Sequence, residues 1–214
     1  GSFKPTDGGI YRIIATGKDE KGNEVRSSTF LWVSGEKFIN WRQENNDRID
    51  LVADKKSYQV GDKAQILIPS PYQGDVEALL TIERGKVISY QRMTLKSNSE
   101  TVTVPILPEY VPNVCVSVVL VKGPDATSPL ASFKLGYVQL KVSTEQKEIK
   151  ITLTPDKEVY RPGETATYTV ETVNFEGKPI EAELSLNLVD KSVLALADWT
   201  SGTMMDTFWR ERGV

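Results

Sequence analysis

The chain has 214 residues, 39% of them hydrophobic and 26% charged, and a formal net charge of −3, values that are typical of a globular protein. Its basic and acidic residues are interspersed, which argues against a nucleic-acid groove, and no run approaches the roughly 20 apolar residues of a membrane span. One Cys and no His exclude an intrachain disulfide and any catalytic relay that needs His, so enzyme activity is not expected.

The first predicted strands lie near the amino terminus. Residues 10–16 and 27–33 favour strands, and the polar stretch "GKDEKGNE" forms the turn between them. We expect these to be the last two strands of a β-domain, over residues 1–35, and residues 36–48 to be a linker. The opening Gly-Ser resembles a cloning scar rather than a signal peptide, so we expect the chain to be part of a longer protein.

Residues 49–143 carry enough strand patterns for one complete β-sandwich. The alternation from Val114 onward is that of a strand with one face against a core, and we expect Val116, Val118 and Leu120 to face inward. Cys115 lies in the same apolar run, where a thiol is a small hydrophobe rather than a nucleophile. Strands are expected before residue 54 and over residues 64–68, 76–83, 86–94, 101–107, 114–121 and 133–142.

A third unit, residues 144–214, begins like the second and stops short of a complete sandwich. The alternation in "EAELSLNLVD" predicts a strand over residues 181–190, with Ala182, Leu184, Leu186 and Leu188 on one face. After residue 196 the alternation is lost. The predicted fold class is therefore all-β, with tandem antiparallel β-sandwiches of the immunoglobulin or fibronectin kind, one complete and two partial.

Two stretches, "DKKSYQVGDKAQI" and "DKEVYRPGETATY", share one pattern and align with their tyrosines 102 residues apart. This offset suits a row of β-sandwich domains of about 100 residues. The Tyr can cap the edge of a core and the Gly permits a turn with positive φ, so we interpret the motif as a structural turn. A calcium site is disfavoured because Ca²⁺ takes six to eight oxygen ligands, and no metal or cofactor is expected. The motif residues are Tyr58, Gly61, Asp62, Tyr160, Pro162, Gly163 and Glu164.

Longer blocks that include these motifs resemble the alpha-2-macroglobulin family, in particular its bacterial members. They are "YQVGDKAQILIPSPYQGDVEALLTIERGKVISYQ" and "YRPGETATYTVETVNFEGKPIEAELSLNLVDKSVLALAD". The second block is the more specific, since it resembles the family's opening of the domain that carries the bait region. The residues of this likeness are Tyr160, Pro162, Gly163, Gly177, Pro179, Val189, Asp190, Lys191, Ser192, Val193 and Leu194. The resemblance implies macroglobulin-like β-sandwich domains.

The resemblance further implies a broad-spectrum endopeptidase inhibitor that works by entrapment. In this family a protease cuts an exposed bait segment and is then caged, in many members through a Cys-x-Glu-Gln thioester. This chain lacks that motif, because Cys115 is followed by Val-Ser and the single Glu-Gln pair follows Thr144. The implied partners are target proteases and neighbouring macroglobulin-like domains. The implied location is extracytoplasmic, periplasmic or at the cell surface, with a lipid anchor on the full-length protein as one form.

The final stretch, "WTSGTMMDTFWRERGV", is a candidate protease-sensitive segment close to the bait. It follows the last alternating pattern, so trypsin is expected to cut at Arg210 or Arg212 well before it cuts at Lys55, Lys56, Lys157 or Arg161. The alternative is a linker whose aromatic side chains dock on a sandwich. The candidate residues are Met204, Met205, Phe208, Trp209, Arg210 and Arg212.

Two other functions are compatible with an array of β-sandwiches. The first is a cell-surface adhesion or structural array of immunoglobulin-like modules, since a fold alone does not select a function. A carbohydrate-binding sandwich ranks last, because Trp32, Trp41, Trp199 and Trp209 are scattered along the chain. The favoured interpretation is a scaffold segment of a protease inhibitor, with no catalytic, cofactor or metal site of its own.

Overall fold

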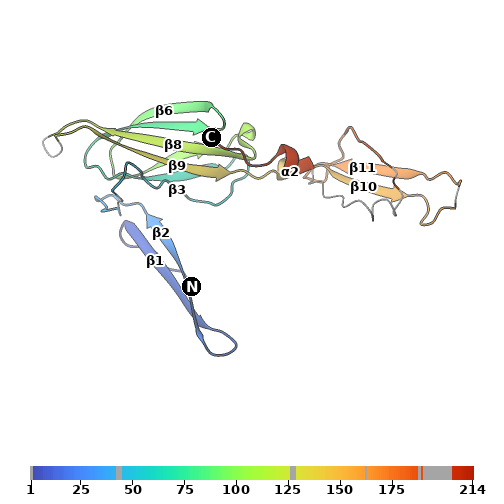
Figure 1. The fold of residues 1–214 in the computed structure, drawn as a ribbon, viewed down its shortest axis with the longest axis horizontal. Helices are drawn as coiled ribbons and strands as arrows, with labels where there is room; N and C mark the ends of the chain where they lie inside the picture. Colours follow the sequence, from blue (N-terminus) through green and yellow to red (C-terminus); the bar gives the residue numbers. More distant parts are fainter. Residues whose placement is uncertain (1, 42–44, 126–128, 162, 188, 190–203) are drawn as a thin grey trace. The chain divides into compact units, whose positions relative to one another are not determined.

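The computed structural model describes residues 2–41, 45–125, 129–161, 163–187, 189 and 204–214. Its elements are almost all antiparallel strands (Figure 1), as the alternating patterns predict. They belong to two compact units, one of Gly1–Val142 with Arg212–Val214 and the other of Ser143–Glu211. The predicted all-β fold class is therefore confirmed.

The first unit contains a β-sandwich of two antiparallel sheets. One sheet has the order β3 (Val52–Ala53), β4 (Lys63–Pro69) and β7 (Ser99–Pro105). The other has the order β6 (Val87–Leu95), β5 (Val76–Glu83), β8 (Asn113–Lys122) and β9 (Ser132–Lys141). A short 3-10 turn, η1 (Pro108–Tyr110), precedes β8. All seven strands predicted between residues 49 and 143 are present.

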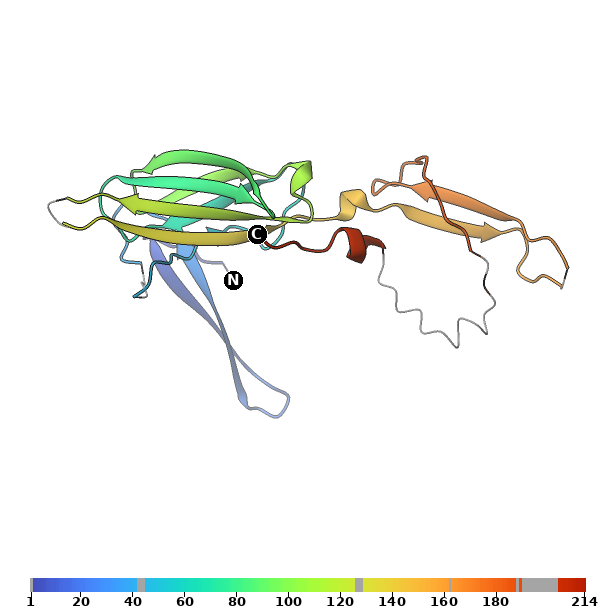
Figure 2. The same ribbon diagram turned by 45° about the horizontal axis from the view of Figure 1, so that its top comes forward.

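The core lies between the inner faces of these two sheets, which Figure 2 shows as layers. β8 contributes Val114, Val116, Val118 and Leu120, all fully buried, so the predicted inward face of this strand is confirmed. Successive side chains of a strand point to opposite faces, which is why every second residue enters the core. Each buried aliphatic side chain contributes about 1.5–3 kcal/mol relative to an exposed one.

A long hairpin precedes the sandwich in the same unit. Its strands β1 (Gly9–Lys18) and β2 (Glu24–Val33) pair antiparallel over their full length, as predicted. Beyond β2, the Trp41 ring stacks on Trp32 with 5.5 Å between the ring centroids, and Trp41 is buried together with Leu67 of β4. Part of the stretch predicted as a linker, residues 36–48, thus packs against the sandwich.

Over its described residues, the second unit contains one pair of antiparallel strands, β10 (Lys150–Pro155) and β11 (Tyr168–Val173). The same residues also form a 3-10 turn, η2 (Glu145–Lys147), and a helix of a single turn, α2 (Met204–Phe208). The sequence pattern does not indicate α2, because five residues are too few to show a helical period.

The strand predicted over residues 181–190 is wrong for its described part. Residues 181–187 form no strand, and Leu184 and Leu186 are 47% and 66% exposed. An alternating pattern makes a segment compatible with a strand, but a strand also needs a hydrogen-bonded neighbouring strand. Leu188 and Asp190, the remaining named positions of that prediction, lie outside the described residues.

Candidate functional site

The first copy of the repeated motif forms a compact turn around the carboxylate of Asp54. The Tyr58 hydroxyl donates a hydrogen bond to Asp54 Oδ1 at 2.8 Å and accepts one from the Lys55 N–H at 3.1 Å. The same Asp54 oxygen accepts from the Gln65 N–H at 2.8 Å, which joins the turn to β4. Lys55 Nζ lies 2.9 Å from Asp62 Oδ2, and this ion pair closes the turn on its outer side.

The second copy repeats these contacts. The Tyr160 hydroxyl donates to Asp156 Oδ1 and accepts from the Lys157 N–H at 3.2 Å. Asp156 Oδ1 also accepts from the Thr167 N–H at 3.0 Å, and Lys157 Nζ pairs with Glu164 Oε2 at 3.5 Å. The repeated sequence therefore produces the same hydrogen-bonded turn twice.

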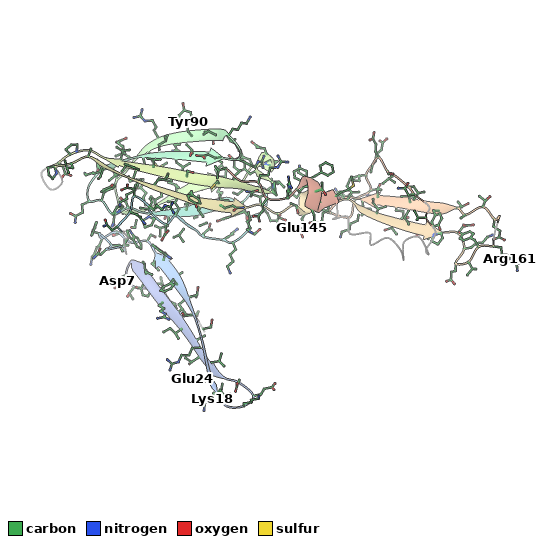
Figure 3. The ribbon with its side chains drawn as sticks, in the orientation of Figure 1. Asp7, Lys18, Glu24, Tyr90, Glu145 and Arg161 are labelled. Carbon is green, nitrogen blue, oxygen red and sulfur yellow. The ribbon has the colours of Figure 1, made fainter. Side chains whose placement is uncertain are left out.

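The glycines of the motif have the backbone conformation that the turn requires. Gly61 has a φ of 94° and Gly163 a φ of 86°, which residues with a Cβ rarely adopt. In the second copy the backbone N–H of Arg161, which Figure 3 labels, donates to Glu164 Oε2 at 3.1 Å. Pro162 lies outside the described residues.

The two tyrosines differ in their surroundings. Tyr58 is 1% exposed, and burial raises the pKa of its hydroxyl to about 12; the Lys55 N–H opposes this shift and the Asp54 carboxylate adds to it. Tyr160 is partly exposed, and the hydrogen bond to Asp156 raises the pKa of this hydroxyl while it lowers the pKa of Asp156. Both phenols therefore act as hydrogen-bond donors near neutral pH, and neither is an activated base or nucleophile.

The shift at Tyr58 predicts a loss of stability in alkaline solution. Below pH 10 the hydroxyl is protonated in both the folded and the unfolded chain, so the stabilisation is complete. Between pH 10 and about 12 the unfolded chain releases this proton first, and the free energy of unfolding should fall by up to about 3 kcal/mol. Urea unfolding at a series of pH values should show this slope in the unchanged chain and a shallower one in Tyr58→Phe.

The matched control is Tyr137→Phe on β9, because the Tyr137 side chain is 64% exposed. This variant should keep the slope of the unchanged chain. Equal slopes in Tyr58→Phe and in the unchanged chain would contradict the prediction.

The candidate protease-sensitive residues are spread over α2 and the segment after it. Met204 and Phe208 are 77% and 60% exposed. Met205 and Trp209 are partly buried, and Lys147 Nζ lies 5.3 Å from the Trp209 ring centroid, within the range of a cation–π contact. Arg210 and Arg212 are exposed, but the backbone of Arg212 is hydrogen-bonded to Asn113. The structure therefore does not gather these six residues into one site.

The single Cys is buried on β8, on the face opposite to Val114 and Val116. Cys115 is 7% exposed on β8, and burial raises the pKa of its thiol, with a further contribution from the negative charge of Glu83. A nucleophilic thiol needs a lowered pKa. The expectation that Cys115 is a small buried hydrophobe is confirmed.

The described ranges show neither a metal-binding cluster nor a membrane-spanning helix. Within them, no group of three or more Cys, Asp or Glu side chains could hold a metal ion. No helix in the same part of the chain is long enough and apolar enough to cross a membrane.

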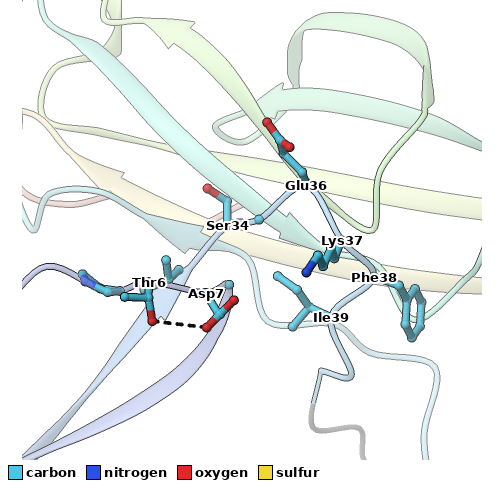
Figure 4. A pocket seen from close by; sticks show the side chains of 11 residues that line it. Thr6, Asp7, Ser34, Glu36, Lys37, Phe38 and Ile39 are labelled. Atoms are coloured by element: carbon cyan, nitrogen blue, oxygen red, sulfur yellow. Dashed lines mark hydrogen bonds between the residues drawn. The ribbon is translucent and has the colours of Figure 1, made fainter.

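Figure 4 shows a pocket of about 520 Å³ at the base of the hairpin, lined by residues 5–8 and 33–39. The two segments that line it approach each other closely at Gly8 and Gly35, where a Cβ on Gly8 would lie only 3.0 Å from the Gly35 Cα atom. Thr6 donates a hydrogen bond to Asp7 at its rim. None of the residues predicted as sites lines this pocket.

A family model and several curated proteins match the sequence of this chain. Residues 49–196 match the family model of the alpha-2-macroglobulin bait region domain. Over its full length the chain is 28% identical to an alpha-2-macroglobulin homolog of Nostoc sp., and over 91% of its length it is 30% identical to the alpha-2-macroglobulin of Ralstonia nicotianae. It covers 11% and 12% of those proteins, so it spans about a tenth of their length. The solved native structure of E. coli alpha-2-macroglobulin aligns with 97% of this chain and 13% of its own, at a TM-score of 0.45 and 18% identity.

Proposed function

The chain belongs to the alpha-2-macroglobulin family, and on that premise we propose that it is a segment of a broad-spectrum endopeptidase inhibitor that traps proteases after they cut a bait region. The observation that carries this proposal is the bait region domain match, which covers the sandwich and continues into the second unit. In the proposed mechanism these residues position the bait and take no part in covalent chemistry. Target proteases are partners of the full-length protein.

A scaffold role agrees with the chemistry of the side chains present. The sequence has no His, its only Cys is buried with a raised pKa, and the motif tyrosines are hydrogen-bond donors. We infer that the chain is not an enzyme. Candidates for cleavage near the bait remain in the segment from Met204 onward. They are exposed residues whose side chains proteases can recognise, among them Phe208 and Arg210.

We further propose that the chain contains one complete macroglobulin-like domain and parts of two others. Residues 1–35 would be the last strands of one, 36–48 a linker, 49–143 a complete sandwich and 144–214 the first part of another. Exposed apolar side chains support this arrangement, since Phe30 and Ile14 on the hairpin and Ile151 on β10 are 53–61% exposed. Neighbouring domains of the same protein would cover them. An extracytoplasmic location, periplasmic or at the cell surface, belongs to the same proposal.

The decisive test compares two substrates of one protease in the presence of the full-length protein. A caged protease keeps a free active site, so cleavage of a large protein substrate should slow far more than cleavage of a short peptide. The chain of residues 1–214 alone should leave both rates unchanged and should not react with amines. Equal inhibition of the two substrates by the full-length protein would indicate an active-site blocker, and no inhibition would favour an adhesive or structural array.

A further inference from the structure

Two buried asparagines of the sandwich each bind the backbone of a residue far away in the sequence. Asn98 Nδ2 donates to the Ile39 carbonyl at 2.6 Å, and Asn98 Oδ1 accepts from the Ile39 N–H at 3.1 Å. Asn113 Nδ2 donates to the Arg212 carbonyl at 2.7 Å, and Asn113 Oδ1 accepts from the Arg212 N–H at 2.9 Å. In each pair a side-chain amide satisfies both polar groups of one residue, as a neighbouring strand would.

Asn113 is the first residue of β8, and the loop that precedes it is held in place by other contacts. The Arg84 guanidinium donates to the Glu109 carbonyl at 2.8 Å and to the Val111 carbonyl at 2.7 Å, in the loop that leads to Asn113. On the other side of the loop, the Val142 N–H donates to the Pro112 carbonyl at 2.7 Å. Asn113 itself is 2% exposed. A fixed loop and a buried amide lose little conformational freedom when they bind a ligand.

The Asn113 contact recognises main-chain atoms and leaves the side chain of the bound residue in solvent, whereas Ile39, bound by Asn98, is 8% exposed. Arg212 is exposed, although its N–H and carbonyl are both paired with Asn113. The ligand is therefore defined as extended polypeptide backbone, whatever side chain it carries. Proteases also bind their substrates as extended chain through backbone hydrogen bonds. A residue held by Asn113 cannot offer the same N–H and carbonyl to a protease.

We propose that Asn113 is a binding site for extended polypeptide backbone, that the chain's own segment at Arg212 occupies it, and that this contact protects the bond after Arg212 from proteolysis. The inference goes beyond the proposed function, because the two hydrogen bonds form whether or not the full-length protein traps proteases. It also separates two candidates that the sequence treats alike, since Arg210 lies outside this contact.

Amide hydrogen exchange of the full chain, followed by NMR, tests the contact directly. Replacement of Asn113 by Ala should accelerate exchange of the Arg212 amide by about tenfold or more, because two hydrogen bonds are lost. Asn98→Ala is the matched control and should accelerate exchange at Ile39 while leaving Arg212 protected. The amide of Val118, in the middle of β8, reports whether the sandwich stays folded in each variant.

A second variant keeps the test decisive if Asn113→Ala unfolds the sandwich. Arg212→Pro removes the N–H that donates to Asn113 Oδ1 without changing the sandwich sequence. Loss of this bond weakens the paired contact, so the Asn113 side-chain amide protons, which donate to the residue-212 carbonyl, should exchange faster. In limited trypsin digests, Asn113→Ala should raise the ratio of cuts after Arg212 to cuts after Arg210 by about tenfold. The proposal is overturned if the Arg212 amide exchanges equally fast with and without the Asn113 side chain, or if Arg212→Pro leaves the Asn113 amide unchanged.

Discussion

Replacement of Leu120 by Ala should lower the free energy of unfolding of the sandwich by about 2–5 kcal/mol. Leu120 is fully buried on β8, and it faces the core together with Val116 and Val118. The smaller side chain buries less apolar surface and leaves a cavity that the strands on either side of β8 can only partly fill. Urea unfolding of the unchanged chain and of Leu120→Ala gives this difference directly.

The neighbouring residue supplies the control. Val121 lies next to Leu120 on the same strand, but its side chain points to the opposite face and is 50% exposed. Val121→Ala should therefore change the free energy of unfolding by about 0.5 kcal/mol or less. Similar costs at both positions would mean that the inner and outer faces of β8 are assigned wrongly.

Replacement of Gly136 by Ala should destabilise the same sandwich by about 1–3 kcal/mol, because the added methyl group has no room. A Cβ at Gly136 would lie 2.7 Å from the Ile49 carbonyl oxygen and 2.9 Å from Leu51 Cγ. The segment before β3 is fixed at this place, since the Ile49 N–H donates to the Leu135 carbonyl at 3.0 Å. Thermal and urea unfolding should both show the loss, together with faster amide exchange at Ile49.

Gly17 on β1 is the matched control for this substitution. A Cβ at Gly17 would meet no atom within 4 Å, so Gly17→Ala should leave the stability unchanged to within about 0.5 kcal/mol. If Gly136→Ala were equally harmless, the close approach of residues 49–51 to β9 would not exist in solution.

The parts of the fold that the sequence predicts are those set by local pattern. The buried face of β8 can be predicted from the alternation of apolar residues alone, because residues two positions apart on a strand lie on the same face. The repeated turn is equally local, since Tyr58 binds groups three and four residues away. The strand expected from residue 181 onward failed for the opposite reason, because a strand also depends on a partner that alternation does not supply.

The asparagine contacts could not be predicted from the sequence. Asn98 binds a residue 59 positions away and Asn113 one 99 positions away, and neither spacing belongs to a known motif. Each contact also uses the backbone of the bound residue, so the identities of Ile39 and Arg212 carry no signal. The composition of the segment from Met204 to Arg212 suits proteases, but composition cannot distinguish a residue whose backbone is hydrogen-bonded from one whose backbone is not.

The repeated turn also bears on how the chain reaches its fold. In the second copy Tyr160 is partly exposed, yet its hydrogen bonds match those of the buried Tyr58, so the turn does not depend on a completed core. Its contacts join residues no more than 11 positions apart, and such short loops cost little entropy to close and form early. The sandwich and the second unit thus each carry near their start a segment that can reach its native conformation during synthesis, before the ribosome has made the strands that follow it in the chain.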